Sequence, residues 1–310
     1  MNRPEINSDI ELVQILIYLA DVKDMTRQSL NNLPYCSAID KWFSKYKGHE
    51  AVMKTRDLII NKHFNFTRPH MAALRLSEIN ESDGDDLFDW ANEVKRFWLD
   101  TKYHEFIQQQ SPYYGWILNT LYECKLDDWI SYTEHYFDRK PDEFHLIICP
   151  LDGNYGFNLN KPSGEVVSYS IRCMPYYKDG NPIWQFDYFA KGFAHEYAHC
   201  FVNPVVESQK ELLSQHQSFF DSHINMPDFY NTNYAVINEY FVRAFAIRFM
   251  EEFAFDGFDI KAEYERQRAN FTYIDTFVKE LKEYENSGGS FEVFYSMNID
   301  RILSQLENKC

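Results

Sequence analysis

The sequence predicts an α+β protein that is mostly helical, because helical patterns occupy both ends of the chain and strand patterns only its middle. Apolar residues between Leu12 and Leu19 recur at the spacing of one helix face. Val166–Arg172 alternates between apolar and polar residues, as a strand does. Helices, one patch of strands and helices again do not form the alternating order of a parallel α/β fold.

Residues 1–142 are predicted to form an N-terminal helical region. After the first helix, the segments with helical patterns are Ile39–Tyr46, His49–His63, Pro69–Leu76, Leu87–Gln109 and Pro112–Phe137. Asn80–Asp86 is a polar loop whose acids suit the start of the next helix. Pro112 is expected at the first position of its helix, where a missing N–H is tolerated.

Residues 143–310 are predicted to form a second region that begins with a small antiparallel sheet within residues 143–185. Its strand candidates are Phe144–Cys149, Gly153–Leu159 and Val166–Arg172. A helix is expected over residues 186–202, and Asn203–Pro204 is expected to end it or to cap the next one. The rest, residues 203–310, is predicted to be helical.

Composition excludes several classes of partner. The 310 residues carry 31 Lys and Arg against 47 Asp and Glu, a net charge of −16, which argues against a nucleic-acid or anionic-membrane surface. No apolar run approaches the ~20 residues of a membrane span. Acidic residues near Met1 are unlike a signal peptide. The protein is therefore cytoplasmic if Met1 is native, or exported if the chain is a trimmed mature form; the oligomeric state stays open.

The segment with chemical information is Phe193–Pro204, FAHEYAHCFVNP. His195 and His199 are four residues apart, so on a helix they lie one turn apart and can reach the same zinc ion. Glu196 lies beside that face, where its carboxylate can accept a proton from a metal-bound water. The alternative is a pair of core histidines that bond to the backbone, but such a polar face is costly to bury without a partner.

A catalytic zinc site needs a third protein ligand. Val202 and Val205 stand where a metzincin would have Gly and His, so that variant is excluded. A gluzincin instead uses a Glu on a later helix, and the downstream candidates are Glu207, Glu211, Glu239, Glu251 and Glu252. Glu239 is favoured because it lies within an apolar helix, where a carboxylate needs a partner. Arg243, one turn on, is the ordinary partner, and it is compatible with a ligand role.

The segments HEYAHCFVNP and, some forty residues later, NEYFVRA resemble a bacterial family of uncharacterised gluzincin-type metallopeptidases, catalogued as a domain of unknown function. Asp9–Leu19 and Ile39–Val52 resemble the opening helices of that family. The resemblance implies a zincin-like core. It also implies zinc ligands His195, His199 and Glu239, with Glu196 as the catalytic acid/base, and supporting positions at Asn203 and Arg243.

The implied reaction is zinc-assisted hydrolysis of peptide bonds, in which Glu196 takes the proton of the attacking water and passes it to the leaving amine. A second donor for the oxyanion could come from residues between the two motifs, and three are candidates: His223, Tyr230 and Tyr234. An edge strand would pair with an extended substrate, and both Gly153–Leu159 and Val166–Arg172 could serve.

Two other functions remain open at this level. One is a non-catalytic binding module on an inactive zincin scaffold, which the intact chemical residues disfavour. The other is a zinc hydrolase that acts on a non-peptide amide, since this motif does not require a peptide. The expected partner is a peptide or protein substrate, and the expected cofactor is Zn²⁺.

Overall fold

A computed structural model describes residues 3–22, 34–61, 63–64, 67–121, 124–151, 153–173, 176–178, 181–183, 186–221 and 232–308. The chain divides into two compact units. Unit 1 comprises Met1–Cys124, His145–Tyr155 and Tyr169–Gln185, and unit 2 comprises Lys125–Phe144, Gly156–Ser168 and Phe186–Cys310. The division into regions 1–142 and 143–310 stays a prediction, because compactness alone does not test it.

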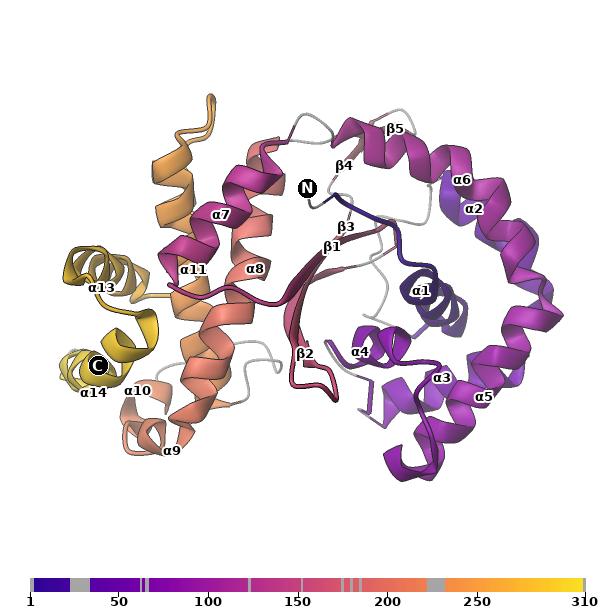
Figure 1. The fold of residues 1–310 in the computed structure, drawn as a ribbon, viewed down its shortest axis with the longest axis horizontal. Helices are drawn as coiled ribbons and strands as arrows, with labels where there is room; N and C mark the ends of the chain where they lie inside the picture. The colour runs from indigo at the N-terminus through magenta and orange to yellow at the C-terminus, as the bar shows by residue number, and fades with distance from the viewer. Residues whose placement is uncertain are drawn as a thin grey trace. The chain divides into compact units, whose positions relative to one another are not determined.

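The helices of unit 1 gather around α1 (Figure 1). They are α1 (Ser8–Ala20), α2 (Pro34–Phe43), α3 (Glu50–Ile60), α4 (Arg68–Leu74), α5 (Asp85–Asp100) and α6 (Tyr103–Thr120). α1 begins where the Asn7 side chain accepts hydrogen bonds from two first-turn N–H groups. α1 packs against α3 and α4, and α3 packs against α5. The central helix α1 is accordingly buried almost all round.

The sheet is mixed, which corrects the predicted antiparallel arrangement. Its strands β1 (Glu143–Cys149), β2 (Asn154–Asn160) and β3 (Val166–Cys173) have the order β1-β3-β2. Asp142 N–H donates to the Val166 carbonyl where β1 and β3 begin, so these two strands run in the same direction. A short turn at Lys161–Glu165 joins β2 to β3, which run in opposite directions. A separate antiparallel pair consists of β4 (Tyr176–Lys178) and β5 (Asn181–Ile183).

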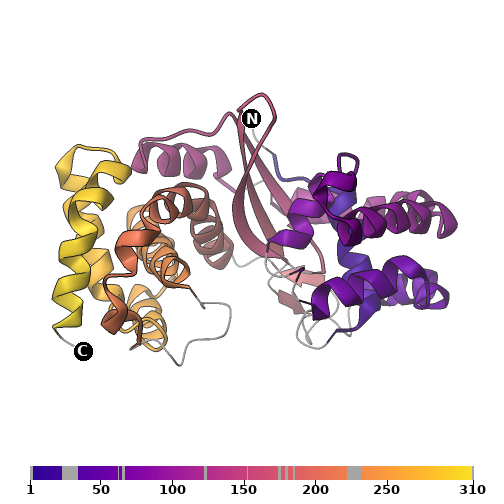
Figure 2. The ribbon, with the colours of Figure 1, turned by 90° about the horizontal axis from the view of Figure 1, so that it is seen from below.

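Unit 2 is built around two long helices, α8 (Phe186–Ser208) and α11 (Asn233–Phe253), which pack side by side (Figure 1). Its other helices are α7 (Leu126–Tyr136), α9 (Lys210–Leu213), α10 (Gln217–Asp221), α12 (Ile260–Arg268), α13 (Ile274–Ser287) and α14 (Phe291–Glu307). α13 packs against α11, and the yellow α14 of Figure 2 packs against α10 and α8. No helix within the described ranges is both long and apolar enough to span a bilayer.

An aromatic core supports the two long helices of unit 2. The Trp129 ring of α7 contacts the rings of Phe189 and Phe193 on α8. It also contacts the rings of Phe249 on α11 and of Phe255. Because these rings are large and all but Phe255 are buried, they fix the two helices against each other at several turns.

The structure corrects several predicted helix bounds. Residues 87–137 form parts of three helices rather than two, and Pro112 lies inside α6. Pro112 has no N–H to donate to the carbonyl of Gln108, four residues earlier. Gln108 lies on the exposed face of α6, where water can donate instead. Residues 203–310 are mostly helical, as predicted.

The helix predicted to end at Val202 continues to Ser208, with Pro204 inside it. Pro204 has no N–H to donate to the carbonyl of Cys200, four residues earlier. The side chain of Asn158 on β2 donates to that carbonyl at 2.7 Å instead, and Ser168 on β3 holds the Asn158 amide oxygen at 2.6 Å. The helix continues past Pro204 because a side chain of β2 donates in place of the missing N–H.

Candidate metal centre

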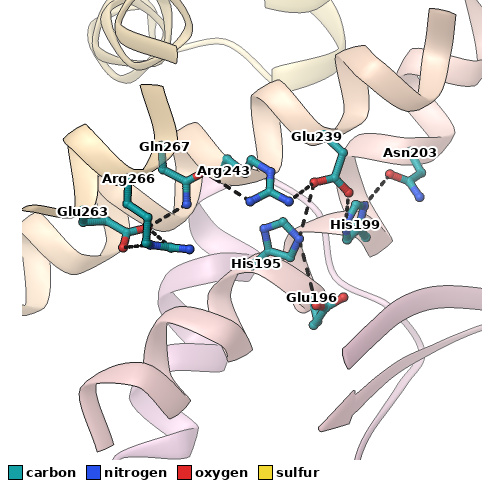
Figure 3. Close-up of polar contacts among 9 residues, drawn as sticks. All are labelled: His195, Glu196, His199, Asn203, Glu239, Arg243, Glu263, Arg266 and Gln267. Carbon is teal, nitrogen blue, oxygen red and sulfur yellow. Dashed lines mark hydrogen bonds and ion pairs between the residues drawn. The ribbon is translucent and has the colours of Figure 1, made fainter. Parts of the chain in front are cut away.

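His195 and His199 project from the same face of α8 (Figure 3). Their ring centroids are 5.0 Å apart, and their side chains are 18% and 12% exposed. Two imidazoles at this spacing can reach one ion, as the predicted motif requires. The ligand atoms of His195, Glu196 and His199 lie within 4.8 Å of one another, and this group could hold a metal ion.

Glu239 on α11 faces both imidazoles. Its Oε1 lies 3.5 Å from His199 Nε2, and its Oε2 lies 3.8 Å from His195 Nε2. Ligands about 2.1 Å from a tetrahedral zinc ion are separated from one another by about 3.4 Å. The distances from the carboxylate oxygens to the two Nε2 atoms are therefore close to those expected for three ligands of one zinc ion.

Glu196 differs from Glu239 in its relation to the imidazoles. Its side chain is buried, and its Oε1 lies 4.0 Å from His195 Nε2. Both carboxylates are within reach of an ion, so proximity alone does not separate a ligand from a base. Glu239 lies somewhat closer, at 3.5 and 3.8 Å from the two imidazoles against 4.0 Å between Glu196 and His195, and these shorter distances suit a ligand.

Asn203 fixes the tautomer of His199. The Asn203 Oδ1 atom lies 2.9 Å from His199 Nδ1, one turn further along α8. An amide oxygen only accepts, so Nδ1 carries the proton, and a neutral His199 presents the lone pair of Nε2 towards Glu239. Two electron-rich atoms then face each other at 3.5 Å. A cation between them, either a proton or a metal ion, removes that repulsion.

Arg243 holds the other side of the Glu239 carboxylate. Its Nη2 forms an ion pair with Glu239 Oε2 at 2.7 Å, and this oxygen has no hydrogen-bond donor of good geometry among the described residues. Burial raises the pKa of Glu239, but contact with His199 and the charges of His195 and Arg243 outweigh it. The pKa is thus held well below its usual range.

The same contact acts on His199 with the opposite sign. Burial by itself lowers the pKa of the His199 imidazole. The hydrogen bond and the charge of Glu239 outweigh burial, with smaller contributions from Glu196 and Asn203, so the pKa is raised. Without a bound ion, the site therefore favours a positive charge between His199 and Glu239.

Strand β2 runs along α8 beside these residues. A Cβ added at Gly156 would lie 1.5 Å from the carbonyl oxygen of Glu196, so a side chain at this position cannot be accommodated without a shift of backbone. Two residues on, Asn158 bonds the Cys200 carbonyl, one helical turn beyond Glu196. β2 is an edge strand, whereas β3 lies between β1 and β2 and has no open edge. Of the two candidate strands, only β2 has an edge that no strand of the described sheet occupies.

The structure describes five of the seven other sequence candidates. His223 and Tyr230 fall outside the described residues, and Tyr234 is half-buried in the first turn of α11. Glu207, Glu211 and Glu252 are exposed, and Glu251 forms an ion pair with Arg248.

Two residues near the site escaped the sequence prediction. Gln267 of α12 accepts a hydrogen bond from Arg243, and Glu263 of the same helix binds Gln267 (Figure 3). Both are buried. Their segment, IKAEYERQR, has the composition of a solvated helix, so no sequence signal distinguishes them.

No curated protein and no solved structure is significantly similar to this chain. Residues 77–299, more than half of the chain, match a family described as a domain of unknown function (DUF4932). The matched region includes the sheet, α8 and α11, and so all four predicted site residues. The chain therefore belongs to the family of the domain of unknown function DUF4932.

Proposed function

We propose that this protein is a zinc-dependent metallopeptidase of gluzincin type, in which His195, His199 and Glu239 hold the metal ion. The observation that carries the proposal is the position of the Glu239 carboxylate, which faces Nε2 of both imidazoles. The donor set of two imidazoles and one carboxylate is typical of a catalytic zinc site. The tautomer that Asn203 imposes on His199 gives Nε2 the lone pair that a ligand needs.

Bound in this position, zinc supplies a Lewis acid that polarises a carbonyl group and increases the acidity of water. Glu196, whose buried carboxylate lies 4.0 Å from His195 Nε2, is the proposed base that accepts the proton of the attacking water. Glu196 then donates the proton to the leaving amine. Arg243 keeps the charge of Glu239 compensated throughout.

The edge position of β2 supports a peptide as the substrate class. An extended peptide that adds to β2 would gain backbone hydrogen bonds from the strand. Gly156 holds β2 in close approach to the backbone of Glu196, so such a peptide would pass next to the proposed base.

Elemental analysis of the purified protein tests the metal site. The wild type is expected to contain about one zinc ion per chain, and Glu239→Ala to lose it. Glu207→Ala is the matched control, because Glu207 is an exposed glutamate on the same helix as the histidines. Zinc content unaffected by Glu239→Ala would assign the third ligand elsewhere, and no zinc after reconstitution would reject the metal site.

Digestion of a peptide library by the zinc-loaded protein tests the reaction. Glu196→Gln is expected to retain zinc and to lose turnover, because glutamine cannot accept the proton of water. Hydrolysis of small amides without hydrolysis of peptides would identify the non-peptide alternative. Zinc binding with no hydrolysis of either would identify a binding protein on an inactive scaffold.

A further inference from the structure

Helix α12 carries a buried carboxylate that is surrounded by donors. Glu263 is 6% exposed and binds Arg266 Nε at 3.0 Å and Gln267 Nε2 at 2.7 Å. Lys191 Nζ on α8 lies 3.2 Å from the same carboxylate. Burial raises the pKa of Glu263, but these donors outweigh it and lower the pKa, so the group is ionised at neutral pH.

The ionised Glu263 determines which way the Gln267 amide points. A carboxylate only accepts hydrogen bonds, so the amide NH₂ must face Glu263 and the amide oxygen must face away. That oxygen accepts from Arg243 Nη1 at 3.2 Å, and Arg243 Nη2 pairs with Glu239 (Figure 3). Donors and acceptors therefore alternate along the chain of contacts from α12 to the proposed ligand.

Arg243 has little freedom within this chain of contacts. Its guanidinium carbon lies 4.3 Å from the centre of the Phe271 ring, just beyond the end of α12. The guanidinium thus meets an aromatic face, the Gln267 oxygen and the Glu239 carboxylate. A guanidinium is planar and its donors point in fixed directions, so fixing Nη1 also fixes the direction of Nη2.

Lys191 connects the same carboxylate to the other half of the site. It lies on α8 four residues before His195, hence one turn away on the same face. Glu263 is consequently linked to α8 through Lys191 and to α11 through Gln267 and Arg243. These two helices supply the histidines and Glu239, respectively.

We propose that Gln267 and Glu263 are positioning residues, through which α12 holds Arg243 and so orients the Glu239 carboxylate towards His195 and His199. This inference rests on the proposed function, because it concerns the affinity of the same metal site. Both residues act through Arg243 and not as ligands of the ion. Partners of this kind typically change metal affinity 10- to 100-fold when they are removed.

The test measures zinc affinity by competition with a chelator for the wild type, Gln267→Leu and Glu263→Gln. Both variants are expected to bind zinc about tenfold more weakly than the wild type. The absorption spectrum of the Co²⁺-substituted protein is also expected to change in both variants. This spectrum reports the geometry of the metal ligands, which a general loss of stability would not alter in the folded protein. The double variant Glu263→Gln with Gln267→Glu restores the alternation of donors and acceptors and is expected to recover most of the affinity.

Glu280→Gln provides the matched control. Glu280 is 5% exposed and pairs with Arg301 as Glu263 pairs with Arg266, but it joins α13 to α14. This variant is expected to keep the zinc affinity and the Co²⁺ spectrum of the wild type. Unchanged affinity and spectrum in Gln267→Leu and Glu263→Gln, with zinc bound to the wild type, would overturn the inference alone. A wild type that binds no zinc would overturn the proposed function and the inference with it.

Discussion

In each unit a glutamate lies largely enclosed within an apolar helix, and the surroundings of the two glutamates are opposite. Glu11 in α1 of unit 1 is 1% exposed and accepts a hydrogen bond from Tyr35, and no cation pairs with it among the described residues. Burial raises the pKa of Glu11 to about 7, although the bond from Tyr35 lowers it. Glu239 in unit 2 has Arg243 and two imidazoles around it, and its pKa is lowered.

The comparison shows that an apolar helix around a glutamate does not by itself predict a charged site. Both helices place a single glutamate within an apolar stretch, and a buried carboxylate needs a partner in either case. In α1 the partner is a tyrosine, and the carboxyl group can remain protonated. In α11 the partners are cations, and the group remains charged. Burial of an acid identifies a charged site only when cations converge on it.

The largest effect is expected from Glu239→Gln. If this substitution left zinc affinity unchanged, the proposed contrast between Glu239 and Glu11 would be wrong. The substitution removes the charge and a proposed ligand, so zinc affinity is expected to fall by more than about 100-fold, beyond the range for partners that do not touch the ion. Competition with a chelator measures this change. Glu11→Gln is the control, and its zinc affinity is expected to equal that of the wild type.

Glu11→Gln is expected to stabilise the protein at pH 8. The folded protein keeps a proton on Glu11 between pH 4.5 and about 7, where the unfolded chain has lost it. The folded state binds more protons there, so stability falls as pH rises through this window, by about 3 kcal/mol at most. Glutamine does not titrate and avoids that loss, so the variant is expected to gain about 2 kcal/mol at pH 8 and little at pH 4.5.

Urea unfolding at the two pH values measures the gain. Glu280→Gln is the contrast, because Glu280 pairs with Arg301 and its loss leaves that arginine without the ion pair. That variant is expected to lose stability at pH 8. Equal effects of the two substitutions would mean that Glu11 also has a cationic partner.

Asn203→Leu sharpens the description of the metal site. Without the amide oxygen, the proton of His199 can move to Nε2, which then cannot bind an ion. Zinc affinity is expected to fall about tenfold. Asn203→Asp keeps an acceptor for Nδ1 and is expected to retain the affinity, so similar losses in both variants would contradict the tautomer argument.

The smallest effect is expected from Tyr35→Phe in unit 1. This substitution removes the hydrogen bond that lowers the pKa of Glu11, so that pKa is expected to rise. A loss of about 1 kcal/mol of stability at pH 8 is expected, the usual contribution of one hydrogen bond. The measurement is the midpoint of the pH dependence of unfolding, which should move upwards; a midpoint that moves downwards would contradict the assigned donor.

Local patterns predicted the mostly helical α+β class and the helix that carries His195 and His199, and they favoured Glu239 as the third ligand. The motif spacing is local, and the apolar surroundings of Glu239 are visible within α11. The direction of β1 relative to β3 depended on pairing across more than twenty residues, which a pattern does not encode. The assigned roles of the site residues stay predictions.

The C-terminal end of α8 shows a second limit. A proline usually ends a helix, so the sequence predicted that the helix stops before Pro204. The prediction was wrong because the replacement donor, Asn158, lies 42 residues before the Cys200 carbonyl to which it donates. Gln267 and Glu263 were missed for a related reason. Their helix is polar overall, and only the packing of three helices makes these two side chains buried.

The bond between Asn158 and the Cys200 carbonyl also has a consequence for the order of folding. A helix normally forms from local contacts within microseconds, ahead of strand pairing. The Cys200 carbonyl, however, has no helical donor because of Pro204, and it gains a donor only when β2 docks. The last two turns of α8 are therefore expected to reach their full protection only together with the sheet. Amide hydrogen exchange should therefore place Val205–Ser208 in the same cooperative unit as β2, separate from the first turns of α8.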